Sequence, residues 1–122
     1  MTPTKKVRPT EFKLHQKSRM LEIRFDDGSR FELSCEYLRT HSPSAEVRGH
    51  GPGQEVLQTG KEKVNITGIE PVGSYAVSLQ FDDGHDTGIY SWEYLYDLGV
   101  NREKYWNAYL KRLQEAGYQR KA

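Results

Sequence analysis

The 122-residue sequence has one cysteine, no long apolar run and almost no net charge. A single cysteine excludes an internal disulfide framework and a metal cage built from cysteines alone. No apolar run approaches the roughly 18 residues of a membrane-spanning helix, and the first residues lack a signal-peptide core. Eighteen basic residues against 17 acidic ones leave +1, which removes a global electrostatic case for nucleic acid or an anionic membrane. We therefore expect a soluble, cytoplasmic monomer.

Apolar side chains are also scarce, because hydrophobic residues make up only 35% of the chain and include all eight Tyr. A chain of this length forms one domain, here with a small, aromatic-rich core. We expect that domain at residues 18–118, after a polar, basic arm at 1–17 and before a short tail at 119–122. The arm allows two interpretations: a loosely attached segment ending in an edge strand near Phe12 and Leu14, or a basic docking arm.

The sequence does contain an internal repeat. The motif FDDG at Phe25–Gly28 recurs at Phe81–Gly84, an offset of 56 residues. The motif EYL at Glu36–Leu38 recurs at Glu93–Leu95, an offset of 57. Two copies are too few for a solenoid, so the repeat indicates a duplicated supersecondary unit.

Each copy has the pattern of strand, tight turn, strand and short helix. Leu21, Ile23 and Phe25 alternate with charged residues, which is the period of a half-buried strand. The Asp-Gly step that follows favours a hairpin turn. Ser34 in the first copy and Ser91 in the second are placed to cap the helix that comes next.

The rest of the chain completes an α+β fold. Residues 41–60 contain two Pro and four Gly, which predicts a long loop. Val64 to Pro71 reads as a strand, and Arg102 to Ala116 as a helix with Asn101 as its cap and Gly117 as its end. We predict an antiparallel sheet of four to six strands, built from two related β-hairpin–short-helix units, with a C-terminal helix packed on one side.

Two segments offer candidate chemistry. His85 and Asp86 lie in the second turn, where they could present an imidazole and a carboxylate to a metal or partner, or simply suit a turn. In the loop, Arg48 and the glycines near His50 could form an anion-binding nest, or the loop is merely flexible.

No catalytic arrangement is visible in the sequence, so we predict that the protein is not an enzyme. Cys35 has the inward parity of a small buried residue. Neither a Ser-His-Asp order, a zinc spacing nor an iron-oxygenase pair is present. The spacing of the aromatic residues and the low net charge favour a packed core over base stacking, which makes a nucleic-acid partner a weak alternative.

Two stretches are distinctive: EYLRTHSPSAEVRGHGPGQ (Glu36–Gln54) and FDDGHDTGIYSWEYLYDLG (Phe81–Gly99). Through them the sequence resembles, over roughly residues 10–100, the domain family named after the N-terminal domain of gamma-butyrobetaine hydroxylase. That family implies a compact mixed α/β fold with an antiparallel sheet. Its members occur alone in small bacterial proteins, fused to Mrp-type P-loop carriers of iron–sulfur clusters, and ahead of the oxygenase core of carnitine-pathway dioxygenases.

In those dioxygenases the resemblance implies a structural zinc held by three Cys and one His. The matching positions here are Ser42, Ser44, Val47 and His85, so three of the four ligands are lost. Serine and valine cannot replace thiolates as zinc ligands. The location survives, and a patch of His41, His50, His85 and Asp86 beside Glu46 could bind iron or another divalent metal weakly. The chain also has no oxygenase core, so kinship in fold does not transfer that activity.

The leading hypothesis is a non-catalytic accessory or interaction domain that serves iron–sulfur carriers or iron-dependent proteins. The alternatives are a weak iron-binding protein that uses His85, His50, His41 and Asp86, and a small enzyme without a recognisable constellation. The predicted binding face lies on the loop and the second turn and comprises Arg39, Ser42, Ser44, Glu46, Arg48, Gly49, Gly51, Gly53, Gln54 and Thr87.

Overall fold

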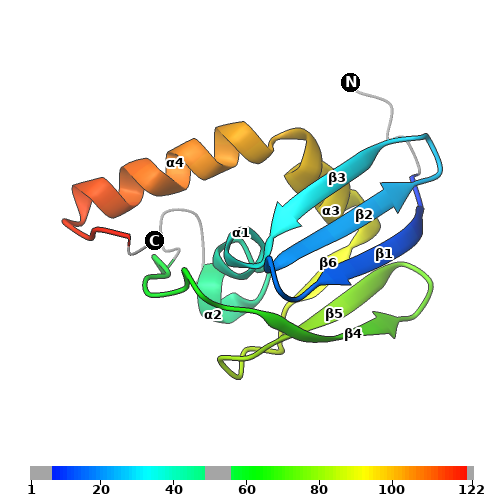
Figure 1. The fold of residues 1–122 in the computed structure, drawn as a ribbon, viewed down its shortest axis with the longest axis horizontal. Helices are drawn as coiled ribbons and strands as arrows, with labels where there is room; N and C mark the ends of the chain where they lie inside the picture. Colours follow the sequence, from blue (N-terminus) through cyan, green and yellow to red (C-terminus); the bar gives the residue numbers. More distant parts are fainter. Residues whose placement is uncertain (1–6, 49–55, 121–122) are drawn as a thin grey trace.

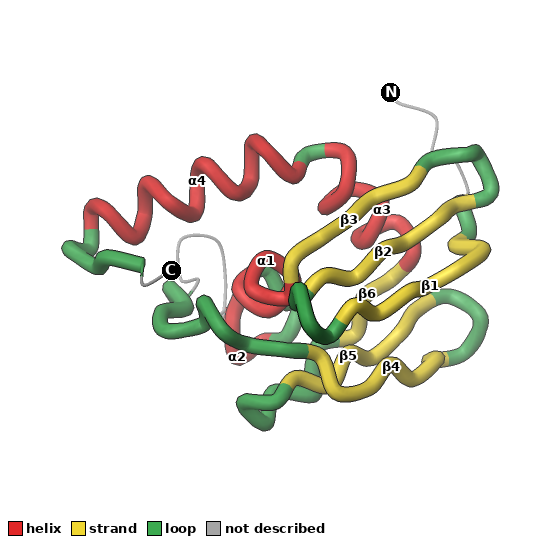
Figure 2. The backbone as a smooth tube through the Cα atoms, viewed as in Figure 1, coloured by secondary structure: helices red, strands yellow, loops and turns green. Residues whose placement is uncertain are grey.

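The computed structural model describes residues 7–48 and 56–120 (Figure 1). The elements follow one another as β1 (Pro9–His15), β2 (Met20–Phe25), β3 (Arg30–Ser34), α1 (Cys35–Thr40), α2 (Ala45–Arg48), β4 (Ile66–Val72), β5 (Ala76–Phe81), β6 (Ile89–Ser91), α3 (Trp92–Val100) and α4 (Arg102–Glu115). Figure 2 shows the strands gathered on one side of the molecule, with α4, α1 and α2 on the other. The predicted α+β class is confirmed.

The strands form two antiparallel sheets, β1-β2-β3 and β4-β5-β6, each a meander of three strands. The prediction of one continuous sheet is therefore corrected to two. Both sheets contribute to a single core, together with α1 and α3. Its fully buried side chains include Leu21, Ile23, Leu33, Leu38, Ile66, Leu79, Tyr90, Leu95 and Leu98. The two units cannot be separate domains, because they share this core.

The repeat is longer than the sequence motifs indicate, since β1 and β4 also correspond. The Thr10 hydroxyl donates to the carbonyl of Arg24 at 3.3 Å, and the Thr67 hydroxyl donates to the carbonyl of Gln80 at 3.2 Å. Each of these outer strands also has a register shift near its start, at Pro9/Glu11 and at Ile66/Gly68. The unit is thus three strands and a helix.

The predicted turn and cap residues are confirmed. Gly28 and Gly84 occupy the left-handed region with φ of 88° and 89°, which glycine adopts without strain. The hydroxyls of Ser34 and Ser91 accept from the backbone N–H of Tyr37 and Tyr94 at 3.0 and 3.1 Å. Each hydroxyl therefore satisfies an N–H that the first turn of its helix leaves unpaired.

Asn101 is the N-cap residue of α4, as predicted, but its side chain makes no capping hydrogen bond. Its amide instead donates back to the carboxylate of Asp97 at 2.8 Å. The helix ends at Glu115, and Gly117 follows with φ of 77°, as its place after the helix predicted.

The two units exchange reciprocal hydrogen bonds. The Tyr37 hydroxyl donates to the carbonyl of Leu98 at 2.7 Å, and the Tyr94 hydroxyl donates to that of His41. Tyr94 is 57 residues after Tyr37, and His41 is 57 residues before Leu98. The contacts therefore map onto each other when the units are exchanged, which is the property of a pseudo-two-fold arrangement.

The structure bears on the predictions made for the N-terminal arm and for a membrane-spanning helix. Part of the predicted arm is ordered as β1, an edge strand whose Phe12 and Leu14 pack against the core. The basic residues Lys5 and Lys6 lie outside the described residues, so a docking role for the arm stays a prediction. Within residues 7–48 and 56–120, no helix is long and apolar enough to cross a membrane.

Candidate functional site

The pseudo-symmetry is broken at one pair of positions. In the first unit, the ring of Phe31 lies against Gly99, where an added Cβ would come within 2.5 Å of the ring. In the second unit the corresponding positions are Gly88 and Ser42, and a Cβ on Gly88 would lie 2.4 Å from the Ser42 hydroxyl. The space that a phenyl ring fills in one half is polar in the other.

A hydrogen-bonded group occupies this polar space; we call it the His85 cluster (Ser42, Ser44, Glu46, His85 and Thr87). The Ser42 hydroxyl lies 2.9 Å from Nε2 of His85, and a carboxylate oxygen of Glu46 lies 3.1 Å from Nδ1. The hydroxyls of Ser44 and Thr87 are 2.7 Å apart. These bonds attach the segment after α1 to the turn between β5 and β6.

The turn that carries His85 is held by Asp83. One oxygen of its carboxylate accepts from the backbone N–H of His85, and the other accepts from Arg39 at 2.9 Å and Lys61 at 2.7 Å. Partial burial raises the pKa of Asp83, but the hydrogen bonds from Lys61, the His85 backbone and Arg39 outweigh it and lower the pKa to about 2. Asp83 is therefore a fixed anion at neutral pH.

Burial favours a neutral His85 ring. It lowers the pKa of His85, and the charge of Arg39 lowers it further, while Glu46 and Asp83 act in the opposite direction. A carboxylate only accepts, so the neutral ring donates from Nδ1 to Glu46 and accepts the Ser42 proton at Nε2. Both ring nitrogens are then occupied.

This order of Ser, His and Glu is the order of an acyl-transfer relay. Sequence analysis missed it, since Ser42 and His85 are 43 positions apart and no local motif links them. The Ser42 side chain, however, is only 1% exposed and lies against Gly88. Its oxygen also accepts from the backbone N–H of Ser44 at 3.2 Å. A buried hydroxyl that is already bonded on two sides is placed to hold the fold rather than to attack a substrate.

The histidines predicted to share a metal are not brought together. Nδ1 of His41 lies 2.9 Å from the carbonyl of Tyr37, and its ring packs among Tyr37, Tyr105 and Tyr109. His50 lies outside the described residues. Asp86 is exposed, and no group of three or more His, Cys, Asp or Glu side chains within residues 7–48 and 56–120 is arranged to hold a metal ion.

The predicted binding face is partly assembled. Arg39 is 7% exposed and bonded to Asp83, so it supports the face from beneath instead of lying on it. Arg48 is exposed, with its guanidinium 5.0 Å from the centre of the Tyr94 ring. Gly49, Gly51, Gly53 and Gln54 lie outside the described residues. Among the residues of α2 and the turn that carries His85, the exposed ones include Glu46, Arg48, Asp86 and Thr87.

Comparison with known proteins identifies relatives along most of the chain. Two proteins with NMR solution structures are similar to it: one is 57% identical with a TM-score of 0.83, covering 98% of this chain and 90% of its own, and one is 46% identical with a TM-score of 0.80, covering 93% and 89%. A crystal structure of a DUF971-family protein of unknown function from Acidithiobacillus ferrooxidans is 39% identical, with a TM-score of 0.64 over 75% of this chain and 92% of that one. No curated protein matches.

The family model described as gamma-butyrobetaine hydroxylase-like, N-terminal, matches residues 12–96. This range contains β2 to β6, α1, α2 and the whole His85 cluster. The chain therefore belongs to the gamma-butyrobetaine hydroxylase-like N-terminal domain family.

Proposed function

We propose that the protein is a non-catalytic accessory domain that binds a protein partner through the surface around the His85 cluster. The observation that supports this is the internal saturation of the cluster. Its hydroxyls and both imidazole nitrogens bond to each other and to Glu46, and the residues Ser42 and His85 are only 1% and 5% exposed, so neither is open to a substrate. A rigid polar centre with an exposed rim suits recognition better than turnover.

The rim offers the mixed chemistry of a protein contact. Asp86 and Thr87 of the turn are exposed, and so is Ile89, which follows them in the chain and is 51% exposed. The Glu46 side chain is 66% exposed, and Arg48 stacks on Tyr94. Exposed polar and charged side chains with an apolar residue beside them are a common composition for a transient interface.

The partner class is proposed from the family resemblance. Members of the family occur fused to Mrp-type carriers of iron–sulfur clusters and ahead of iron-dependent oxygenase cores. A domain that acts beside such proteins in one chain can act on them as a separate chain. We therefore propose an iron–sulfur carrier or an iron-dependent protein as the partner.

The test compares two half-exposed apolar residues. I89D places a charge directly after the turn that carries His85, whereas V100D places it at Val100, which is 59% exposed at the end of α3. We expect I89D to weaken binding to an iron–sulfur carrier by about tenfold or more, with V100D unchanged. Absence of any complex with such carriers, or an equal loss in both variants, would contradict the proposal.

A second candidate function is weak metal binding at His85 and Glu46. These side chains supply one nitrogen and one carboxylate 3.1 Å apart, and the carboxylate reaches the surface. A metal ion would take the place of the proton that Nδ1 shares with Glu46. Such N/O donors suit iron and other divalent ions. The test is the iron and zinc content of untagged protein purified without oxygen. Near-stoichiometric metal that is lost in H85Q is the expected result, and metal-free wild-type protein would reject this candidate.

A further inference from the structure

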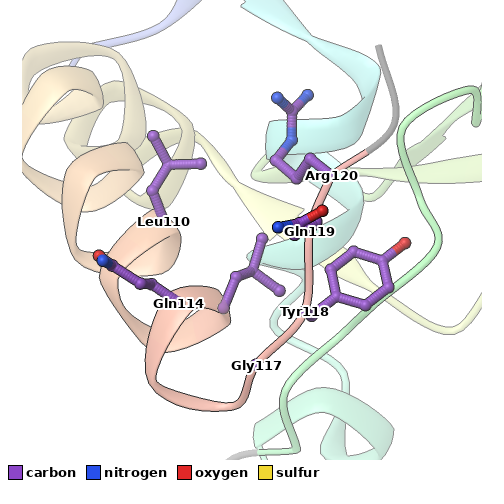
Figure 3. Close-up of a pocket in the computed structure, with 7 residues that line it drawn as sticks. Leu110, Gln114, Gly117, Tyr118, Gln119 and Arg120 are labelled. Carbon is purple, nitrogen blue, oxygen red and sulfur yellow. The ribbon is translucent and has the colours of Figure 1, made fainter.

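The chain turns back on itself after α4. Gly117, with φ of 77°, reverses its direction, and the backbone N–H of Tyr118 donates to the carbonyl of Leu113 at 2.9 Å. The Tyr118 hydroxyl then donates to the Glu62 carboxylate at 2.8 Å. We call Gly117–Arg120 the return segment; Figure 3 shows it passing opposite Leu110 and Gln114 of α4.

Arg120 ends the return segment in a site with two recognition features. Its Nε donates to a carboxylate oxygen of Glu36 at 2.8 Å, and one terminal nitrogen donates to the other oxygen. The guanidinium carbon also lies 5.1 Å from the centre of the Trp106 ring. A bidentate carboxylate beside an aromatic face is the combination that distinguishes arginine from lysine.

The return segment is not packed like the core. A surface hollow of about 400 Å³, open to solvent, lies between it and α4, lined by Leu110, Leu113, Gln114 and the return segment itself (Figure 3). Gly117, Gln119 and Arg120 are exposed. The side-chain bonds of Tyr118 and Arg120 therefore tie an exposed segment to the domain, and a competing chain could replace them.

The pseudo-symmetry shows that the fold itself does not require Glu36 to be covered. The corresponding residue in α3 is Glu93, which is exposed. Glu36 is only 6% exposed and is bonded by Arg120. The carboxylate at this position is thus exposed to solvent in one half and bound by a guanidinium in the other.

We propose that Glu36, the Trp106 ring and the adjoining hollow form a binding site for an arginine-bearing extended peptide of a partner protein, which Arg120 occupies within the chain. The hollow gives room for the residues that flank the arginine. The occupant that the structure holds, a turn followed by an extended Tyr-Gln-Arg, sets the chemistry of the ligand. The site is separate from the His85 cluster and does not rest on its proposed function.

The test vacates the site in the full chain with R120A. An acetylated, amidated Gly-Tyr-Gln-Arg peptide is titrated while the two tryptophan indole N–H signals are followed by NMR. We expect saturable shifts of the Trp106 signal, with an affinity at least several-fold higher than for a Gly-Tyr-Gln-Lys peptide. The Trp92 indole is the internal control, because it donates to the carbonyl of Ser74 on another part of the surface.

Two further variants decide the interpretation. The wild-type chain should bind the peptide more weakly than R120A, since its own Arg120 competes for Glu36. The double variant R120A with E36Q should lose the preference for arginine. A folded R120A protein that shows no saturable Trp106 shift up to about 10 mM peptide, or one that binds the arginine and lysine peptides equally, would overturn the proposal.

Discussion

The two halves of the molecule share one backbone arrangement but differ in the side chains that pack beside their turns. Both have an Asp-Asp-Gly turn, a serine cap and a tyrosine that reaches across to the other half. Beside the first turn, Phe25 and Phe31 pack edge to face with Tyr96 from the second half, with ring centres 5.1 to 5.9 Å apart. Beside the second turn, where Gly88 corresponds to Phe31, the His85 cluster takes the equivalent place. The difference teaches that duplication left one copy to supply packing and freed the other to carry polar chemistry.

The turn carboxylates show the same contrast. Asp27 in the first turn accepts from the neutral Tyr96 hydroxyl at 2.6 Å. Asp83 in the second turn accepts from the cations Arg39 and Lys61. Tyr96 and Arg39 are themselves 57 positions apart, so each reaches the turn of the opposite unit. The second turn is thus held by two cations in addition to the backbone N–H of His85.

Truncating Phe31, the centre of the aromatic group beside the first turn, should have the largest effect on stability. F31A deletes the ring that lies against Gly99 and contacts Phe25 and Tyr96. We expect a loss of about 3 kcal/mol in the free energy of unfolding, because the surrounding rings cannot collapse fully into the space. Urea unfolding measures it. A loss no larger than that of I89A, a truncation of a half-exposed side chain, would show that the ring is not a core element.

Replacing His85 by the serine found at the equivalent position of the first turn should lower the free energy of unfolding by less than F31A does. H85S introduces the residue type of the equivalent position, Ser29, and removes both hydrogen bonds of the imidazole. We expect a loss of about 2 kcal/mol, since the buried Ser42 hydroxyl is left without its partner. S29A is the matched control and should cost under about 0.5 kcal/mol, because Ser29 is only partly buried. Equal losses of stability in H85S and S29A would contradict the idea that His85 contributes more to its turn than Ser29 does.

The sequence predicted the local parts of the fold well. Alternation of Leu21, Ile23 and Phe25 located a strand, and the serine caps and turn glycines were placed correctly because their signals are short-range. The division into two sheets was missed, since strand pairing joins distant residues. The correspondence of β1 and β4 rests on single threonines at 10 and 67, which is too little similarity to detect.

The candidate site was predicted only in outline. The sequence located His85 and the segment of Ser42 to Arg48, and the structure places them together. The sequence alone does not predict that His41 packs among tyrosines, because that packing depends on how α4 folds over α1. The residues expected as a tail provide Arg120, whose partner Glu36 is 84 positions away. Side-chain partners at that separation leave no pattern in a single sequence.

The ion-paired turn gives the smallest of the expected effects, and it depends on pH. The pKa of Asp83 in the folded protein is about 2, below its ordinary value of 3.8. Its contribution to stability is therefore fully present above about pH 4 and is lost as the pH falls toward 2. Because the carboxylate is partly exposed and screened, we expect about 1 kcal/mol. D83N should thus be less stable than wild type at pH 7, and in urea unfolding the gap should narrow below pH 4 and be mostly gone near pH 2. F31A is the control, because it removes no charge, and its deficit should respond little to added salt, whereas that of D83N should shrink. Identical salt dependence in the two variants would mean that the second turn gains nothing from its cations.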